Sequence, residues 1–266
     1  MIPLPETVHA VLNEEELKED RKGFLVIGDV HGCLGELELL VMKAVEANDN
    51  IPFQHVILVG DLVNKGPESA KVIKYVRQNK WLSVRGNHDD GALAAALGDK
   101  GRLKKGKYKW ILEQDDQERM LSDADVEWMA ELPYTIRIPA SMLNDTVDTV
   151  VVHAGFIPDL DVTDQEVATM VTIRWVQPEE DGGYQYVEKD PNLLRGAVLW
   201  AKRWGGPFHV VFGHDARRGL QQQKWATGID TGACYGNQLT GLMLPRRQLV
   251  QVDSLRDYSA TNEKQG

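Results

Sequence analysis

The chain has 266 residues, a length that fits one large domain or two small ones. Hydrophobic residues make up 42% of it, which is enough for a substantial core. Its 30 Lys and Arg are outnumbered by 40 Asp and Glu, which gives a net charge of −10. The chain as a whole therefore has no attraction for nucleic acid, and any polyanionic ligand must be held by a local positive site.

Targeting and redox signals are sparse. Cys33 and Cys234 form no CxxC pair and are too few for a disulfide framework, so we expect reduced thiols. The N-terminus lacks a basic segment followed by an apolar run, and no stretch reaches the ~18 apolar residues that cross a membrane. These features predict a cytoplasmic protein with no membrane partner, and they leave its oligomeric state open.

The first half of the chain alternates strand and helix patterns. Residues 1–22 are largely polar and acidic and are expected to form an N-terminal arm. Beyond them, short apolar runs predict strands and apolar residues at helical spacing predict helices, in the order strand 24–27, helix 35–47, strand 55–59, helix 67–79 and strand 81–84. Such a β-α-β-α-β order predicts parallel pairing of the strands.

Strand patterns stop between residues 91 and 131, which are predicted to form a helical insert or cap. Its stretch 100–109 holds six Lys or Arg and is either a solvated loop or a contact for distal phosphates. Strand patterns resume at 134–138 and continue to the glycine-rich 226–244. We therefore predict one α/β domain over 1–266, a two-sheet αββα sandwich rather than a single doubly wound sheet.

Five apolar runs each end in side chains that can bind metal. The runs lead into Gly28-Asp29-Val30-His31-Gly32, Gly60-Asp61, Gly86-Asn87-His88-Asp89, His153-Ala154-Gly155 and Gly213-His214. Binding sites of open α/β sheets lie at the carboxyl ends of strands. A turn with a surface His could explain one such motif but not five. Carboxylate, amide and imidazole ligands without thiolate suit Mn, Fe, Zn, Co or Mg.

In order and spacing these motifs, with Gly60-Asp61-Leu62-Val63-Asn64-Lys65-Gly66-Pro67, resemble those of phosphoprotein-phosphatase-type metallophosphoesterases over residues 23–250. The nearest likeness is to the ApaH-like phosphatases, relatives of symmetrical diadenosine tetraphosphatase, which the closing segment 228–234 also resembles. The resemblance implies a calcineurin-like fold and two divalent metal ions. One would be held by Asp29, His31 and Asp61, and the other by Asp61, Asn87, His153 and His214. It also implies a metal-bound hydroxide that attacks phosphorus in line.

The same resemblance identifies His88 as the general acid. Where protein phosphatases carry Asp and Arg, this chain has Asn64 and Lys65. Asn64 can orient His88 by a hydrogen bond but supplies no negative charge, so His88 is either a weaker acid or is helped by Asp89 or Asp61. Lys65 offers a point charge in place of a guanidinium fork. This departure is typical of ApaH-like members and argues against a protein Ser/Thr phosphatase.

The predicted reaction is hydrolysis of a phosphoanhydride in a nucleoside or dinucleoside polyphosphate, such as diadenosine tetraphosphate or a capped 5′ end of RNA. Lys65 and Arg203 are the expected phosphate contacts, with Arg85 ranked lower and Arg174 as a further candidate. A base could stack on Tyr235 or Trp200. An inorganic polyphosphatase, a protein Ser/Thr phosphatase and a non-catalytic binding module are the alternatives.

Overall fold

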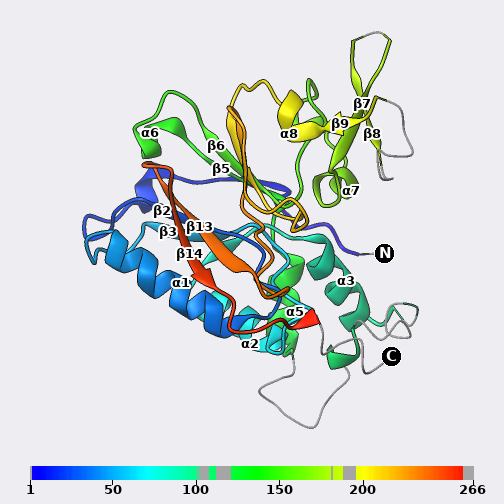
Figure 1. The fold of residues 1–266 in the computed structure, drawn as a ribbon. Helices are drawn as coiled ribbons and strands as arrows, with labels where there is room; N and C mark the ends of the chain where they lie inside the picture. The colour runs from blue at the N-terminus through cyan, green and yellow to red at the C-terminus, as the bar shows by residue number, and fades with distance from the viewer. Residues whose placement is uncertain are drawn as a thin grey trace.

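The structure is a computed structural model that describes residues 2–99, 101, 108–111, 121–180, 182–187 and 196–259. Two sheets form the centre of the molecule, and a small third sheet lies at one end (Figure 1). The five-stranded sheet runs β14 (Gln248–Asp253), β13 (Gln238–Leu244), β2 (Phe24–Ile27), β3 (His55–Leu58) and β4 (Leu82–Ser83). The six-stranded sheet runs β1 (His9–Val11), β5 (Thr135–Ile138), β6 (Thr149–Val152), β10 (His209–Phe212), β12 (Ala226–Gly228) and β11 (Gln221–Gln222). The third runs β8 (Tyr184–Val187), β7 (Trp175–Pro178) and β9 (Val198–Leu199).

The helices pack outside the two large sheets. The α-helices are α1 (Leu34–Ala47), α2 (Ser69–Gln78), α3 (Asn87–Ala96), α5 (Asp123–Ala130), α6 (Ala140–Leu143), α7 (Val167–Met170) and α8 (Trp200–Arg203). Short 3-10 helices are η1 (Glu14–Glu16), η2 (Lys109–Ile111) and η3 (Val162–Asp164). Because α1 and α2 are crossover connections, β2, β3 and β4 pair in parallel, as predicted.

Alternation of side chains along the strands builds the layers. Leu25 and Ile27 belong to the apolar cluster under α1, whereas Phe24 and Val26 belong to the cluster between the two sheets. On the six-stranded sheet, Val211 of β10 belongs to the cluster between the two sheets. The residues on either side of it in β10 belong to a third apolar cluster, on the outer face of this sheet. Both faces of each sheet are thus buried, which confirms the predicted αββα sandwich. Burial of each such aliphatic side chain stabilises the fold by roughly 1.5–3 kcal/mol.

Two predicted segments, the N-terminal arm and the helical insert, differ from the structure in detail. Residues 9–11 of the predicted N-terminal arm form β1, which pairs in parallel with β5 and extends the six-stranded sheet. In the predicted insert, α3, η2 and α5 are helical, but residues 100, 102–107 and 112–120 lie outside the described part, and most of the basic stretch 100–109 with them. The single-domain boundary therefore stays a prediction.

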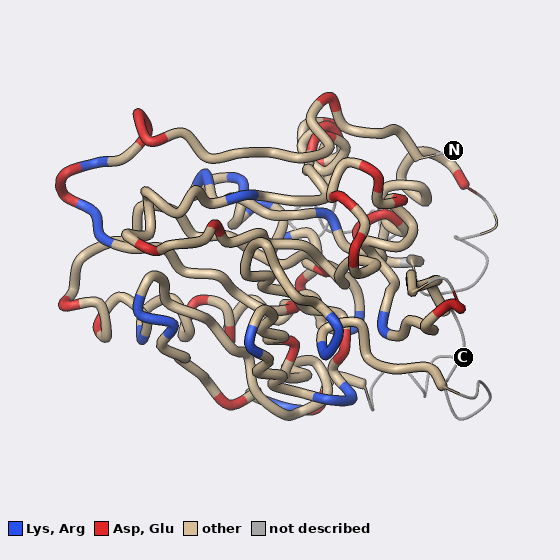
Figure 2. The backbone as a smooth tube through the Cα atoms, turned by 90° about the horizontal axis from the view of Figure 1, so that it is seen from above, with Lys and Arg blue, Asp and Glu red and all other residues tan. Residues whose placement is uncertain are grey.

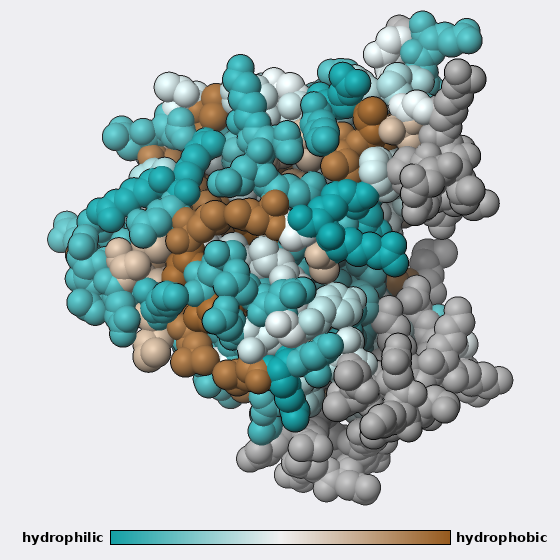
Figure 3. Space-filling view, viewed as in Figure 1, coloured by the Kyte–Doolittle hydropathy of each residue, from teal (hydrophilic) through white to brown (hydrophobic). Residues whose placement is uncertain are grey.

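On the face of the molecule in Figure 3, the residues that the structure describes form no large apolar patch. Hydrophilic side chains cover most of the face in Figure 3, and apolar ones appear there in small separate groups. Cys33 and Cys234 are buried and unpaired, in the cluster under α1. No helix in the described ranges is long and apolar enough to cross a membrane.

Candidate metal centre

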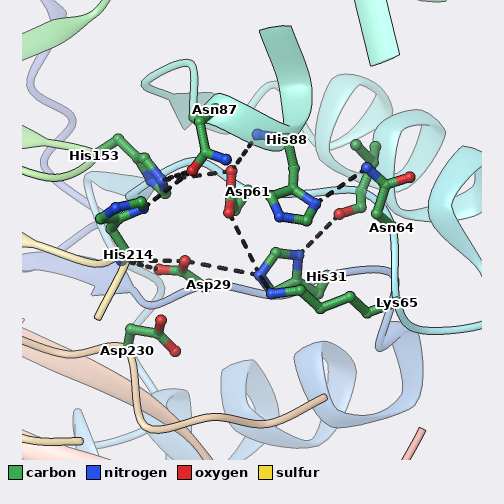
Figure 4. Close-up of polar contacts among 12 residues, drawn as sticks. Asp29, His31, Asp61, Asn64, Lys65, Asn87, His88, His153, His214 and Asp230 are labelled. Carbon is green, nitrogen blue, oxygen red and sulfur yellow. Dashed lines mark hydrogen bonds and ion pairs between the residues drawn. The ribbon is translucent and has the colours of Figure 1, made fainter. Parts of the chain in front are cut away.

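The carboxyl ends of the parallel strands deliver their polar side chains into one buried centre (Figure 4). Each of the six predicted metal-binding residues lies there: Asp29 and His31 after β2, Asp61 after β3, Asn87 at the start of α3, His153 after β6 and His214 after β10. Asp230 lies beside them, after β12. The sequence motifs therefore converge in space, although the strands they follow lie in two different sheets.

Backbone geometry explains why the motifs look as they do. His31, Asp61 and His214 adopt left-handed φ values of 47°, 50° and 69°, which is strained backbone of the kind that clusters at functional sites. The glycines allow close approach. A Cβ on Gly213 would lie 1.9 Å from Asp29 Oδ1, and one on Gly86 would lie 2.4 Å from Asp61 Oδ1. No other residue type fits at these two positions.

Two imidazoles present unprotonated nitrogens to the Asp61 carboxylate. The Nδ1 of His31 lies 2.9 Å from the Val63 carbonyl oxygen, and that of His153 lies 2.8 Å from the Val59 carbonyl oxygen. A carbonyl only accepts, so each Nδ1 carries the proton and each Nε2 keeps its lone pair. These Nε2 atoms lie 3.4 Å from opposite oxygens of Asp61. Each oxygen of Asp61 therefore faces one unprotonated imidazole nitrogen.

The second half of the centre is built the same way. The Nε2 of His214 lies 3.1 Å from the Thr172 carbonyl oxygen and donates to it, which leaves Nδ1 as a lone pair. That Nδ1 lies 3.0 Å from Asn87 Oδ1, and His153 Nε2 lies 3.1 Å from the same oxygen. Lone pairs that face one another without a proton between them repel. A cation among them would turn the repulsion into coordination.

Charge and burial support the same conclusion. Burial, then the nearby Asp230 and Asp61, raise the pKa of Asp29 well above its usual value. Burial lowers the pKa of His31 and His214 well below the ordinary value, so both rings are neutral at pH 7. Neutral imidazoles and crowded carboxylates are the donor set that divalent first-row metals take. The residues present thus fit the metal ions that the motifs imply.

Potential ligand atoms lie close together around Asp61. The atoms of His31, Asp61 and His88 lie within 4.8 Å of one another, and so do those of Asp29, Asp61 and His153. Both groups contain Asp61. The Lys65 ammonium lies 2.7 Å from His31 Nε2, so the lone pair of this nitrogen faces a positive charge in the structure.

His88, the predicted general acid, is held through Asn64. Asn64 Nδ2 donates to His88 Nδ1 over 3.1 Å, and Asn64 Oδ1 accepts from Trp110 Nε1 over 2.6 Å. An indole N–H can only donate, so it fixes the amide with its nitrogen towards His88. His88 Nδ1 must then be an acceptor, and the proton of the neutral ring lies on Nε2. The sequence predicted the Asn64 contact but not Trp110, which comes from η2.

Two predicted phosphate contacts lie elsewhere. Arg85 is completely buried, and its guanidinium donates to the Tyr134 hydroxyl, the Ala130 carbonyl and the Pro3 carbonyl, and pairs with Asp90 at 3.0 Å. It therefore cannot touch a substrate, and its expected phosphate contact is wrong. Arg203 is exposed on α8 and is absent from the described lining of the cleft that holds the metal centre.

Of the two aromatic residues considered for stacking, Trp200 is buried. It packs in the outer apolar cluster against Phe156, and a Cβ on Gly155 would lie 2.1 Å from its ring. It is therefore a core residue and not a platform for a base. Tyr235 is 40% exposed and lines the cleft, where the Lys65 ammonium lies 4.9 Å from its ring centroid.

The cleft over the metal centre has a volume of about 1120 Å³. Four of the predicted metal ligands, His31, Asp61, Asn87 and His214, line it together with Lys65. Its lining also includes Arg174, Trp175, Tyr186, Arg217 and Arg218. Sequence reasoning missed most of this far wall. The signal that could have found part of it is the pair of adjacent arginines that follows His214 by three residues.

Comparisons with known proteins agree with this geometry. The family model of the calcineurin-like phosphoesterases matches residues 23–239. The asymmetrical bis(5'-nucleosyl)-tetraphosphatase PrpE of Anoxybacillus flavithermus is 30% identical over 250 residues, which cover 88% of this chain and 96% of the relative. The symmetrical bis(5'-nucleosyl)-tetraphosphatase of Methylobacillus flagellatus is 26% identical over 85% of this chain and 93% of the relative. A crystal structure provisionally assigned as a diadenosine tetraphosphatase has a TM-score of 0.74 and 29% identity, with 93% of this chain and 98% of the other covered.

Proposed function

Because the chain belongs to the calcineurin-like phosphoesterase family of metal-dependent hydrolases, we propose that it hydrolyses a phosphoanhydride bond of a dinucleoside polyphosphate such as diadenosine tetraphosphate. One observation carries the chemistry: unprotonated nitrogens of His31 and His153 face opposite oxygens of the buried Asp61 at 3.4 Å. The names of the relatives support the substrate class.

In this proposal the centre would bind two divalent ions, each Mn, Fe, Zn, Co or Mg. Asp29, His31 and Asp61 would hold one, and Asp61, Asn87, His153 and His214 would hold the other. When bound, such a pair of ions supplies an activated water and neutralises charge on the phosphoryl oxygens. The backbone carbonyls of Val63, Val59 and Thr172 keep the three imidazoles in the tautomer that leaves a ligand nitrogen free.

His88, Asn64 and Lys65 have roles in hydrogen bonding and charge. His88 carries its proton on Nε2 and would donate a hydrogen bond from it to the oxygen of the departing nucleotide, which stabilises the negative charge that develops there; the neutral ring keeps this proton, because losing it would leave an imidazolate. Asn64 positions His88 and is not itself in contact with the reacting atoms. The ammonium of Lys65, on a flexible stem beside His31, binds a phosphoryl oxygen.

The relatives carry both symmetrical and asymmetrical names, so the bond cleaved is a matter for experiment. The test is hydrolysis, with Mn²⁺ or Co²⁺, of diadenosine tetraphosphate, capped RNA, inorganic polyphosphate and a phosphoserine peptide, with Asp61→Asn as control. ADP as the sole product means symmetrical cleavage, and ATP with AMP means asymmetrical cleavage. Preference for polyphosphate or the peptide would overturn the substrate class and leave the metal centre standing.

A further inference from the structure

The cleft continues well beyond the metal centre. At about 1120 Å³ it exceeds the ~300–1,000 Å³ of typical small-ligand pockets. Its far wall is formed by residues of the three-stranded sheet, Trp175, Tyr186 and Val187, and by the loop that follows His214. A single phosphoryl group at the metal centre leaves this wall without a ligand.

This far wall is strongly positive. Arg174, Arg217 and Arg218 all line it. The buried Asp215 pairs with two of them: Arg218 Nη1 lies 2.9 and 2.7 Å from its oxygens, and Arg174 Nε lies 3.5 Å from Oδ1. One carboxylate against three guanidinium groups leaves a net charge of +2. The chain as a whole carries −10, and its acidic and basic segments are interspersed along the backbone (Figure 2), so this excess is local.

Short contacts tie the positive wall to the metal centre. Arg174 Nη2 donates to the backbone oxygen of His214 over 2.9 Å, and Asp215 is the next residue along the chain. Thr172, whose carbonyl holds the His214 ring, also bonds through its hydroxyl to the Tyr186 hydroxyl at 3.0 Å. The loop that supplies His214 thus also carries Asp215, Arg217 and Arg218, and Arg174 is held against this loop by its bond to the His214 backbone.

Flat groups on this wall suit a nucleoside. The Arg218 guanidinium lies 4.3 Å from the centroid of the Trp175 ring, and Tyr186 is half-buried nearby. Aromatic rings and guanidinium planes stack on nucleobases without regard to base identity. The wall thus offers cations for phosphates and flat surfaces for a base in one continuous cleft.

We propose that Arg174, Arg217 and Arg218, with Trp175 and Tyr186, form a subsite for the second nucleotide of the substrate. The guanidinium groups bind the phosphates that are not attacked, and the aromatic side chains hold the attached nucleoside. This inference rests on the proposed function, since only a substrate with phosphates on both sides of the cleaved bond reaches from the metal centre to this wall.

Arg217→Ala is the sharpest variant, because Arg217 is exposed and forms no hydrogen bond or ion pair with the residues that the structure describes. Arg203→Ala is the matched control, since it removes the same charge from an exposed arginine outside the described cleft lining. Loss of one charge-assisted contact to phosphate should raise KM for diadenosine tetraphosphate about tenfold and leave kcat unchanged. Hydrolysis of p-nitrophenyl phosphate, which has no second nucleotide, should not change. Arg217→Lys should restore part of the loss.

Binding gives a second readout that needs no turnover. In a His88→Ala background with Mn²⁺ present, adding Arg217→Ala should raise the calorimetric Kd for diadenosine tetraphosphate about tenfold. Equal effects on both substrates, or an unchanged Kd, would overturn the subsite, as would failure of His88→Ala to bind the dinucleotide. A wild-type protein that does not cleave the dinucleotide, with binding that still depends on Arg217, would refute the proposed function and retain the subsite.

Discussion

Replacing Trp110 with Phe tests how His88 is kept in its proton-donating form. The change removes the indole N–H that donates to Asn64 Oδ1 over 2.6 Å and keeps most of the apolar ring. The amide of Asn64 is then free to turn its oxygen towards His88 Nδ1. An oxygen there favours a proton on Nδ1 and takes it from Nε2, the nitrogen that faces the departing group in the proposed mechanism.

The size of the effect follows from that one hydrogen bond. A net contribution of about 0.5–1.5 kcal/mol is typical, and about 1.4 kcal/mol corresponds to a factor of ten. We therefore expect kcat for diadenosine tetraphosphate to fall by about two- to tenfold. The fall in kcat should be of similar size for p-nitrophenyl phosphate, because p-nitrophenolate and a terminal phosphate oxygen are both weakly basic leaving groups.

The assay combines kcat for both substrates with ¹⁵N NMR of His88, which reports the protonated ring nitrogen directly. Trp81→Phe is the matched control: Trp81 packs on the same apolar cluster as Trp110 and makes no contact with Asn64 among those described. In Asn64→Asp, one carboxylate oxygen still accepts from Trp110 and the other now faces His88 Nδ1. The His88 proton should therefore move to Nδ1, and the pH–rate profile should change while the metal content stays the same. An unchanged ¹⁵N signature in Trp110→Phe would refute the reasoning.

Three further outcomes follow from the structure. Asp61→Asn should lower the metal content per chain, measured by elemental analysis, because an amide N–H₂ would meet an imidazole lone pair; full metal content would contradict a shared ligand. Arg85→Met should reduce the free energy of unfolding in urea by about 3–5 kcal/mol, since it removes the guanidinium that pairs with the buried Asp90 and donates to three backbone carbonyls, while kcat of the folded enzyme stays the same. In metal-free protein, burial raises the pKa of Asp230 from 3.8 to about 6, so the folded chain binds this proton more tightly than the unfolded chain. The resulting stabilisation is complete below about pH 4 and lost by about pH 6; Asp230→Asn should remove about 3 kcal/mol of this pH dependence in urea unfolding, and parallel curves for both proteins would exclude it.

The sequence predicted which residues gather at the candidate metal centre because the information it uses is local. Each ligand follows a short apolar run within a few residues, and a strand buried on both faces can only be apolar. Gly86 and Gly213 mark the places where a carboxylate approaches the backbone. Parallel pairing of β2, β3 and β4 brings the carboxyl ends of these three strands to one edge of their sheet, whereas the approach of His153 and His214 depends on how the second sheet packs against the first.

Side chains with distant partners could not be placed in this way. Arg85 follows a strand just as the ligands do, but its direction is set by Tyr134 and the Pro3 carbonyl, 49 and 82 residues away in the chain. Trp200 could be a surface platform or a core residue, and its packing against Gly155 decides for the core. β1 has three residues and little hydrophobic pattern, so only its pairing with β5 identifies it.

Asn64 and Lys65 both differ from the protein-phosphatase motif, and the distribution of charge in the cleft suggests a physical reason for the change at Lys65. Lys65 places a point charge beside the centre, and the guanidinium groups of Arg217 and Arg218 lie on the far wall instead. Near the attacked phosphate, a compact ammonium binds phosphoryl oxygens in many orientations. Farther away, the guanidinium groups can bind only a substrate that is long enough to reach them. Discrimination in favour of long phosphate chains would then come from the distal wall, and the chemistry from the metal centre.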